Sequence, residues 1–424
     1  MERAWIYSFQ IKLGANSIVS STTSILDRPE NQPVPQWIRF GSAEYRHAGL
    51  ALFLAGFSCF SLIYCVQPLL PAFADTFGVS PAESSLALSL TMGLLAISIV
   101  LAGAFSQALG RRGLMFCSLA LAAVCDFVAA VTPSWFWLLV ARAIEGFVIG
   151  GVPAVAIAYL SEEIEPAHLG KTIGLYIAGT AFGGMMGRVS MGLLTDFTSW
   201  RVALGIISVL CLAAAIGFLI LLPRSRNFVH RPGFDLAFHL RAWKGHLVNR
   251  DLLRLYACGF LLTSVFVTLF NYATFRFSGA PYFMSPKTIS LIFLVFVFGM
   301  ISSSAAGALA DRFGRRLLLM AGFLTLLAGV VVTLSGSLVL IISGIVLATV
   351  GFFIGHSVAS GSIGPLAGEF KGHAASLYLL FYYMGSSIVG SAGGWFWQHG
   401  GWLAIVGLTG ILALAGLILA AKAR

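Results

Sequence analysis

The stretch GALADRFGRR, residues 307–316, decides how we interpret this chain, because it places a charged hairpin between two long apolar runs. A second stretch of this kind, GAFSQALGRR at residues 103–112, stands about two hundred residues earlier. In both copies a glycine stands where two helices would approach closely, and Gly-Arg-Arg opens the next apolar run. The duplication predicts a chain made of two similar halves.

The later copy resembles the signature loop between the second and third helices of each half of the major facilitator superfamily, roughly Gly-x-Leu-Ala-Asp-Arg-x-Gly-Arg-Arg. It matches at Gly307, Leu309, Ala310, Asp311, Arg312, Gly314, Arg315 and Arg316. The earlier copy keeps its glycines and arginines at Gly103, Gly110, Arg111 and Arg112. It has Gln107 where the family has an aspartate that holds a cytoplasmic gate shut. The resemblance therefore implies a gate in both halves, with a weaker or different closure at Gln107, which accepts hydrogen bonds but carries no charge.

The composition places the chain in a lipid bilayer. Apolar residues make up 58% of the 424 residues and charged residues only 10%, which excludes an ordinary water-soluble domain. A crossing needs about twenty apolar residues. Twelve such runs lie near residues 48–71, 84–108, 114–132, 135–160, 171–195, 202–222, 253–275, 287–310, 317–334, 337–361, 374–397 and 401–421.

The placement of cations predicts the orientation in the membrane. Of the 26 lysines and arginines, 21 fall in segments on one side of the bilayer, and only Arg201, Arg276 and Lys287 fall on the other. This bias follows the positive-inside rule and puts both termini in the cytoplasm. The net charge of +10 is thus explained by topology. A nucleic-acid surface is a poor alternative, because the cations are scattered over many short segments.

An internal repeat supports two halves of common fold. A shift of 202 residues pairs Gly170 with Gly372, Tyr176 with Tyr378, Gly183 with Gly385, Gly192 with Gly394 and Trp200 with Trp402. We therefore predict an all-α membrane protein with twelve transmembrane helices in two pseudo-symmetric six-helix bundles, which is the major facilitator fold.

The predicted segments follow from the same pattern. Residues 1–46 are polar and lack an apolar signal core, so we expect a disordered cytoplasmic tail, or else a start codon assigned too far upstream. Residues 47–222 form the first bundle and residues 253–424 the second. Residues 223–252 are the cytoplasmic linker, whose cations and Trp243 suit an amphipathic segment on the inner leaflet.

Four ionisable residues fall within the apolar runs of the first half: Asp126, Arg142, Glu145 and Arg188. Each costs at least roughly 2.5 kcal/mol in a bilayer unless it is paired, so such residues indicate function by default. We expect them to form one cluster around water. The alternative is two static ion pairs, Arg142 with Glu145 and Asp126 with Arg188.

The run LLVARAIEGFVIGG resembles the superfamily's second motif, Arg-x-x-Gln-Gly, with Arg142 and Gly146 matching and Glu145 in place of the glutamine. In proton-coupled antiporters of the family this arginine is implicated in coupling. The resemblance implies protons as a partner, with Glu145 or Asp126 as the carrier beside Arg142 and Arg188.

Polar aromatic and amide side chains in several runs are candidates for a substrate cavity. These are Tyr64, Gln67, Asn271, Tyr272, Tyr378 and Tyr382. Pro68 near Gln67 predicts a broken helix, which is tolerated where it faces protein or water. The alternative is that these side chains are packing or interfacial residues.

No cofactor, metal site or enzyme activity is expected. The six cysteines have no paired short spacing, and HExxH and GxSxG motifs are absent from the sequence. Gly170-Lys171-Thr172 lacks the first glycine that a phosphate-binding loop requires. A polytopic membrane enzyme or a sensor remains the alternative from another class.

Gly179, Gly183 and Gly187 stand four residues apart and would allow close helix contact. The run resembles the antiporter motif of the family's exporters, although the usual proline is missing. With runs such as CVQPLLP and SLYLLFYYMGSS, the chain is similar to efflux-type carriers of the bacterial inner membrane. We expect a monomeric, proton-coupled exporter of a small molecule that works by alternating access, with uptake and facilitated diffusion as alternatives.

Overall fold

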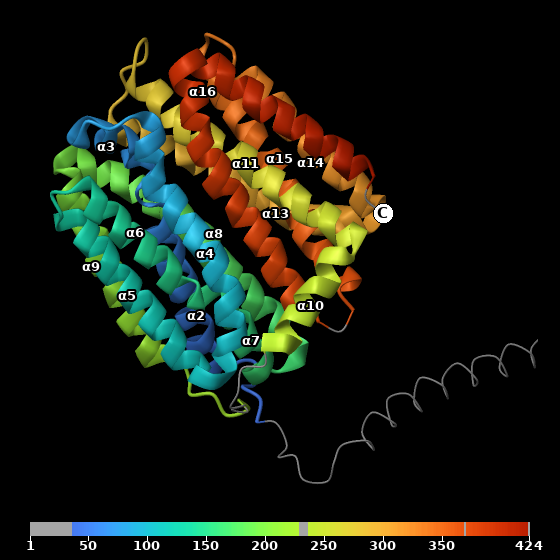
Figure 1. The fold of residues 1–424 in the computed structure, drawn as a ribbon. Helices are drawn as coiled ribbons and strands as arrows, with labels where there is room; N and C mark the ends of the chain where they lie inside the picture. Colours follow the sequence, from blue (N-terminus) through green and yellow to red (C-terminus); the bar gives the residue numbers. More distant parts are fainter. Residues whose placement is uncertain (1–35, 229–235, 369, 423–424) are drawn as a thin grey trace, which may run out of the picture. The chain divides into compact units, whose positions relative to one another are not determined.

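The computed structural model describes residues 36–228, 236–368 and 370–422, and for residues 103–109 and 236 the backbone alone. The predicted tail therefore lies largely outside the described residues. Residues Ile38–Arg424 form one compact unit (Figure 1). At its start, Ile38 forms a parallel β-bridge with Ile164, and the first described helix begins at Ala43.

The unit is built from α-helices joined by short turns (Figure 1). The long helices are α2 (Ala43–Tyr64), α4 (Pro81–Leu109), α5 (Arg111–Val131), α6 (Trp135–Ile149), α7 (Gly151–Glu163), α8 (Leu169–Phe197), α9 (Trp200–Leu221), α10 (Leu236–Val248), α11 (Arg250–Ser278), α13 (Phe296–Phe313), α14 (Arg315–Val332), α15 (Leu338–Leu366) and α16 (Lys371–Ala421). Shorter pieces are η1 (Gln67–Leu69), α3 (Leu70–Phe77), η2 (Pro166–His168), α12 (Pro286–Leu291) and η3 (Ile292–Val295).

The described chain contains enough apolar helix for the predicted crossings. Ten stretches are long and apolar enough to span a bilayer. Helix α8, with 29 residues, is long enough to make a further crossing. Helix α16 contains two helices that meet at Gly401, whose φ of 55° favours glycine. With α8 added and α16 counted as two, the described helices are numerous and long enough for the twelve predicted crossings.

Apolar side chains cover much of the outside of the unit. Phe136, Trp137, Leu210, Val339 and Leu403 are each more than half exposed. Such a surface would be unfavourable in water and is suited to contact with lipid chains.

The two Gly-Arg-Arg hairpins have the same backbone conformation. Gly110, between α4 and α5, has φ 78° and ψ 141°, and Gly314, between α13 and α14, has φ 91° and ψ 141°. A side chain at a positive φ of this kind would be strained, so glycine is required at both turns. The sequence repeat therefore corresponds to a repeated local structure.

Glycines set the closest helix contacts in both halves. A Cβ atom on Gly183 of α8 would lie 2.5 Å from the Cα of Phe57 on α2. Its repeat partner, Gly385 of α16, lies in the same way against the Phe260 carbonyl of α11. Gly183 lets α8 touch the backbone of α2, the first helix of the first half, and Gly385 lets α16 touch the backbone of α11, the first helix of the second half. The two halves therefore repeat the same packing.

Helices α2 to α9 pack mainly on one another, and so do α11 to α16. The two groups meet along two seams, α4 with α16 and α8 with α12. In the first seam Ser387 Oγ donates to the Ser89 carbonyl at 2.7 Å, and Gly394 packs against Ala82. Ala82 stands at the start of α4, whereas the hairpin at Gly110 follows its end. The seams therefore lie toward the end of the unit that is remote from the hairpins.

Candidate functional site

The first long helix breaks inside the unit, and the break supplies free carbonyl groups. Helix α2 ends at Tyr64, and the chain continues through η1 into α3. Pro68 has no N–H group and cannot continue the helical hydrogen-bond ladder. The carbonyls of Leu62 and Ile63 accept hydrogen bonds from Arg142 of α6, at 3.1 and 2.8 Å.

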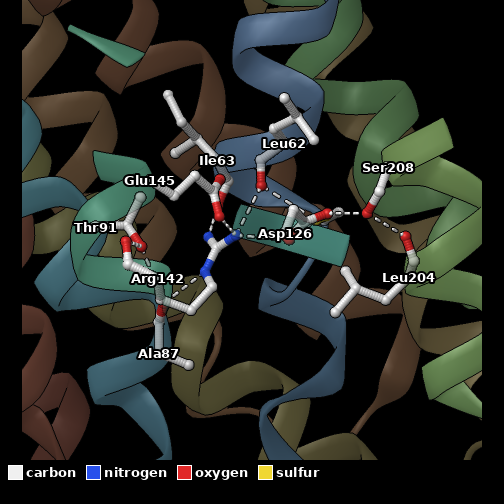
Figure 2. A network of polar contacts seen from close by, with 10 residues as sticks. Leu62, Ile63, Ala87, Thr91, Asp126, Arg142, Glu145, Leu204 and Ser208 are labelled. Atoms are coloured by element: carbon white, nitrogen blue, oxygen red, sulfur yellow. Dashed lines mark hydrogen bonds and ion pairs between the residues drawn. The ribbon is translucent and has the colours of Figure 1, made fainter. Parts of the chain in front are cut away.

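Arg142 lies at the centre of a buried cluster that also contains Asp126 of α5 and Glu145 of α6 (Figure 2). Its Nη1 is 2.9 Å from Asp126 Oδ1 and 2.5 Å from Glu145 Oε2. All three side chains are 0% exposed. Its Nε donates to the Ala87 carbonyl of α4 at 3.1 Å. The guanidinium is thus held by two carboxylates and three carbonyls from four helices.

The two acids have unequal surroundings. Besides the arginine, Asp126 accepts a hydrogen bond of 3.0 Å from Ser208 of α9, and the Cys65 thiol lies 3.8 Å from its Oδ2. Glu145 has Arg142 as its ion-pair partner, and its Oε1 is buried without a hydrogen-bond partner. One cation therefore faces two buried acids, and Asp126 has the further donors Ser208 and Cys65 nearby, which also lie within reach of the Leu204 and Leu62 carbonyls.

This geometry corrects one expectation. The alternative pairing of Asp126 with Arg188 is wrong, because Asp126 pairs with Arg142. The pairing of Arg142 with Glu145 is confirmed. The four charges do not form a single cluster around water, since the Arg142 group is fully buried and Arg188 has other neighbours.

Arg188 of α8 lies among aromatic rings and amides. Its guanidinium carbon is 3.8 Å from the centre of the Tyr64 ring, 5.2 Å from that of Phe293 and 4.9 Å from that of Phe296. Its Nε donates to Gln67 Oε1 at 2.6 Å. Phe293 and Phe296 belong to η3 and α13, so the arginine of one half is covered by rings of the other.

The predicted cavity residues are brought together only in part. Gln67 Nε2 donates to Asn271 Oδ1 at 2.7 Å, which joins η1 to α11. Tyr378 and Tyr382 gather instead around His356, whose Nδ1 lies 2.9 Å from the Tyr378 hydroxyl.

Tyr272 has other partners. Its hydroxyl donates to the Gly390 carbonyl, and its ring stacks on Trp397. Four of the predicted residues are almost fully buried: Gln67, Asn271, Tyr272 and Tyr378. In this state they are packed against protein and do not line an open cavity.

The hairpins differ in their contacts. In the first, Arg111 forms an ion pair of 2.6 Å with Glu162 of α7, and Arg112 donates to the Leu219 carbonyl. Gly103 and Gln107 lie where the structure describes the backbone alone, so the side chain of Gln107 is outside the described residues. In the second hairpin, Asp311, Arg312, Arg315 and Arg316 are exposed.

Several important neighbours were not predicted from the sequence. Ser208, Phe293 and Phe296 carry no sequence signal of their own, because serines and phenylalanines are common in membrane helices. Their proximity to a charged residue depends on which helices pack together. Among the described residues, no group of three or more His, Cys, Asp or Glu side chains is arranged to hold a metal ion.

Comparisons with known proteins agree with this architecture. The sequence matches the profile of the family described as Major Facilitator Superfamily over residues 52–305. It is 42% identical over 381 residues to the "Uncharacterized MFS-type transporter YybF" of Bacillus subtilis (strain 168), covering 90% of this chain and 94% of that protein. It is 44% identical over 391 residues to the "Inner membrane transport protein YnfM" of Escherichia coli (strain K12), covering 91% and 93%.

The fold is also similar to a solved structure of a bacterial homologue of the human lysosomal transporter Spinster, in an inward-facing and occupied conformation. The TM-score is 0.75 at 14% identity, over 91% of this chain and 98% of that one. At this identity the likeness concerns the fold alone.

Proposed function

Since the chain belongs to the major facilitator superfamily and its relatives are membrane transporters, it carries a small solute across a membrane, and we propose that this transport is proton-coupled export. The proposal makes the Arg142 cluster the proton site. The hairpins act as the gate on one side of the membrane. The solute crosses between the two halves as they open alternately.

The charge balance at Arg142 is the observation that carries the proposal. Two carboxylates and one guanidinium leave one excess negative charge in a group that is 0% exposed. An uncompensated buried charge costs several kcal/mol, whereas one bound proton makes the group neutral. A site that is neutral with a proton and charged without it has the property that coupling requires.

Glu145 is the acid that we assign as the proton carrier. Asp126 keeps its charge because Arg142 and Ser208 donate to it. Glu145 shares the same arginine and leaves Oε1 without a partner. Arg142 then serves as the fixed counter-charge, and the broken end of α2 holds it in place through the Leu62 and Ile63 carbonyls.

Export is proposed from the glycines of α8, which resemble the antiporter motif of the family's exporters. Gly179, Gly183 and Gly187 all face α2 at close range. Uptake by symport is the alternative, and the direction of the proton flux distinguishes the two. Antiport moves protons against the solute, and symport moves them with it.

The positive-inside bias supports placing both termini and both hairpins in the cytoplasm, in a bacterial inner membrane. The seams between the halves would then lie toward the outside. In this proposal the monomer is the transporting unit.

The test is transport by full-length protein in liposomes. A panel of labelled solutes is first screened by counterflow, which needs no gradient. An accepted solute is then driven by an imposed pH gradient, while a trapped dye reports proton movement. We expect wild-type protein to couple solute and proton fluxes in opposite directions.

In Glu145→Gln we expect counterflow to persist and gradient-driven transport to fall at least about tenfold, because the exchangeable proton is lost. The matched control is Asp75→Asn, which removes an exposed carboxylate of α3 and should leave both rates unchanged. If Glu145→Gln showed gradient-driven transport at the wild-type rate, Glu145 would not be the proton carrier.

A further inference from the structure

Arg188 begins a chain of hydrogen bonds that crosses from one half of the protein to the other. It donates to Gln67 Oε1 at 2.6 Å, and Gln67 Nε2 donates to Asn271 Oδ1 at 2.7 Å. The three side chains are 2%, 1% and 0% exposed. Every link in the chain is therefore buried.

The arginine fixes the orientation of both amides. A guanidinium only donates, so the atom of Gln67 that faces Arg188 must be its oxygen, and the NH₂ group of Gln67 must face Asn271. The oxygen of Asn271 then faces Gln67, and its NH₂ group points elsewhere. That Nδ2 atom is buried without a hydrogen-bond partner. The chain thus ends in a donor that lacks an acceptor.

Gly390 of α16 lies beside this donor and leaves space for about one methyl group. A Cβ atom placed on Gly390 of α16 would be 3.4 Å from Asn271 Nδ2 and 3.5 Å from Ser89 Oγ, which are ordinary contact distances. Ser89 Oγ is also buried without a partner. Two helices, α4 and α11, therefore bring one unpaired polar atom each to the same place, beside the backbone of Gly390 in α16.

The cation at the other end of the chain has no acid to balance it. Each ion pair found among the described residues involves other groups, so no described carboxylate neutralises Arg188. Three aromatic rings and the carbonyl of Gly184 surround it instead. Ring faces stabilise a cation by less than the burial of its charge costs.

We propose that Arg188, Gln67 and Asn271 form the binding site for an organic anion, and that the transported solute carries a carboxylate. The inference deepens the proposed transport function and rests on it. A carboxylate at Arg188 supplies the negative charge that the guanidinium lacks, and an acceptor atom elsewhere in the solute would pair with the free amide of Asn271 at the other end of the chain. The rings of Tyr64, Phe293 and Phe296 provide an apolar wall for the rest of the molecule.

The position of the site gives the anion a role in the transport cycle. Arg188 and Gln67 belong to the first half, whereas Phe293, Phe296 and Asn271 belong to the second. When the two halves part, the Arg188 guanidinium separates from the Phe293 and Phe296 rings, and the hydrogen bond between Gln67 and Asn271 breaks. An anion paired with Arg188 replaces those contacts and keeps the cation neutralised while the halves move apart.

The test measures ligand selectivity by thermal unfolding of the purified full-length protein, without any pH gradient. The probes are benzoate, pyruvate and succinate as carboxylates, benzamide as a neutral analogue, benzylammonium as a cation and chloride as an inorganic anion. We expect at least one carboxylate to raise the unfolding midpoint with the logarithm of its concentration. Benzamide, benzylammonium and chloride should not.

Arg188→Gln should abolish the carboxylate effect, with binding about tenfold to a hundredfold weaker, as expected for loss of a charge-assisted hydrogen bond. Arg188→Lys should keep part of it. The ligand-free Arg188→Gln protein should unfold at a higher temperature than wild type, because an unbalanced buried charge has been removed. The control is Arg201→Gln, which changes a partly exposed arginine that caps the Ala130 and Thr132 carbonyls.

Three results would overturn the proposal: no carboxylate shifts the wild-type midpoint, benzamide shifts it as much as benzoate, or Arg188→Gln retains the shift. A midpoint shift by chloride alone, lost in Arg188→Gln, would identify an inorganic anion site and would also overturn it. These outcomes are independent of proton coupling, because Glu145→Gln should bind the same carboxylates. Loss of proton coupling with intact carboxylate binding would refute the proposed function alone.

Discussion

Among single residues, those at the break after α2 hold both buried arginines of the first half, Arg142 and Arg188. The carbonyls of Leu62 and Ile63 hold Arg142, while Tyr64 and Gln67, a few residues on, hold Arg188. A continuous helix would use these carbonyls for its own hydrogen bonds. The break near Pro68 therefore supplies hydrogen-bond acceptors to both buried arginines, in addition to any acid that pairs with them.

The unequal surroundings of Asp126 and Glu145 predict unequal effects on stability. Asp126→Asn removes the charge that balances Arg142 and should destabilise the protein by about 3–5 kcal/mol, as expected for a broken buried pair. Glu145→Gln replaces a protonated acid with an amide of the same shape and should change stability by less than about 1 kcal/mol. Thermal unfolding midpoints in detergent measure the difference.

The reverse order of these two midpoints would mean that Asp126 carries the proton and Glu145 the charge. Ser208→Ala provides a matched check. It removes one hydrogen bond to Asp126 and should cost about 1 kcal/mol, well below the cost of Asp126→Asn.

At the scale of elements, glycine determines which helices touch. Gly179, Gly183 and Gly187 bring α8 against α2, since Cβ atoms there would lie 2.5 to 2.7 Å from backbone atoms of Phe53, Phe57 and Ser61. This contact positions Arg188 of α8 beside Tyr64 of α2. The spacing of the glycines thus decides the geometry of the charged site at Arg188, which directly follows Gly187.

Gly183→Ala should therefore lower the unfolding midpoint, because the added methyl group meets the Phe57 backbone and costs about 1–3 kcal/mol. Gly174→Ala, in the same helix, has no atom within 4 Å of its new methyl group. It should be neutral or stabilising by up to about 1 kcal/mol. Equal destabilisation by both substitutions would show that helix propensity, and not close packing, explains the glycines.

Many of the helices and their repeat could be predicted from the sequence. The apolar runs, the two hairpins and the repeat are one-dimensional patterns, and the family, the helical membrane fold and the Arg142–Glu145 contact are confirmed. The boundaries of the four segments, the substrate and the roles of the site residues stay predictions. The partner of Asp126 was not predictable, since it depends on the helix packing that sets which of two arginines its side chain reaches.

The covering of Arg188 could not be predicted for the same reason. Phe293 and Phe296 stand more than a hundred residues away in the chain and look like any lipid-facing phenylalanines. Their place beside the arginine results from the α8–α12 seam between the halves. Residue contacts that form only when the two halves assemble produce no recognisable pattern in the sequence of either half.

In the whole molecule, passage of the solute requires the two halves to part along the seam of α4 and α16. In the described state this seam is closed by close contacts such as Gly93 against Ser387. A Cβ atom on Gly93 would lie 3.6 Å from the Cβ of Ser387. That separation is suited to a disulfide bond, whose Cβ atoms are typically about 3.5–4.5 Å apart.

If the solute crosses only when this seam opens, a disulfide bond across it should stop transport, which counterflow by a Gly93→Cys/Ser387→Cys protein in liposomes measures. The two single-cysteine variants serve as controls for the native cysteines. We predict that oxidation reduces counterflow to background only in the double variant and that reduction restores it. Counterflow that continues unchanged through the oxidised, cross-linked protein would show that the solute crosses without opening of the seam.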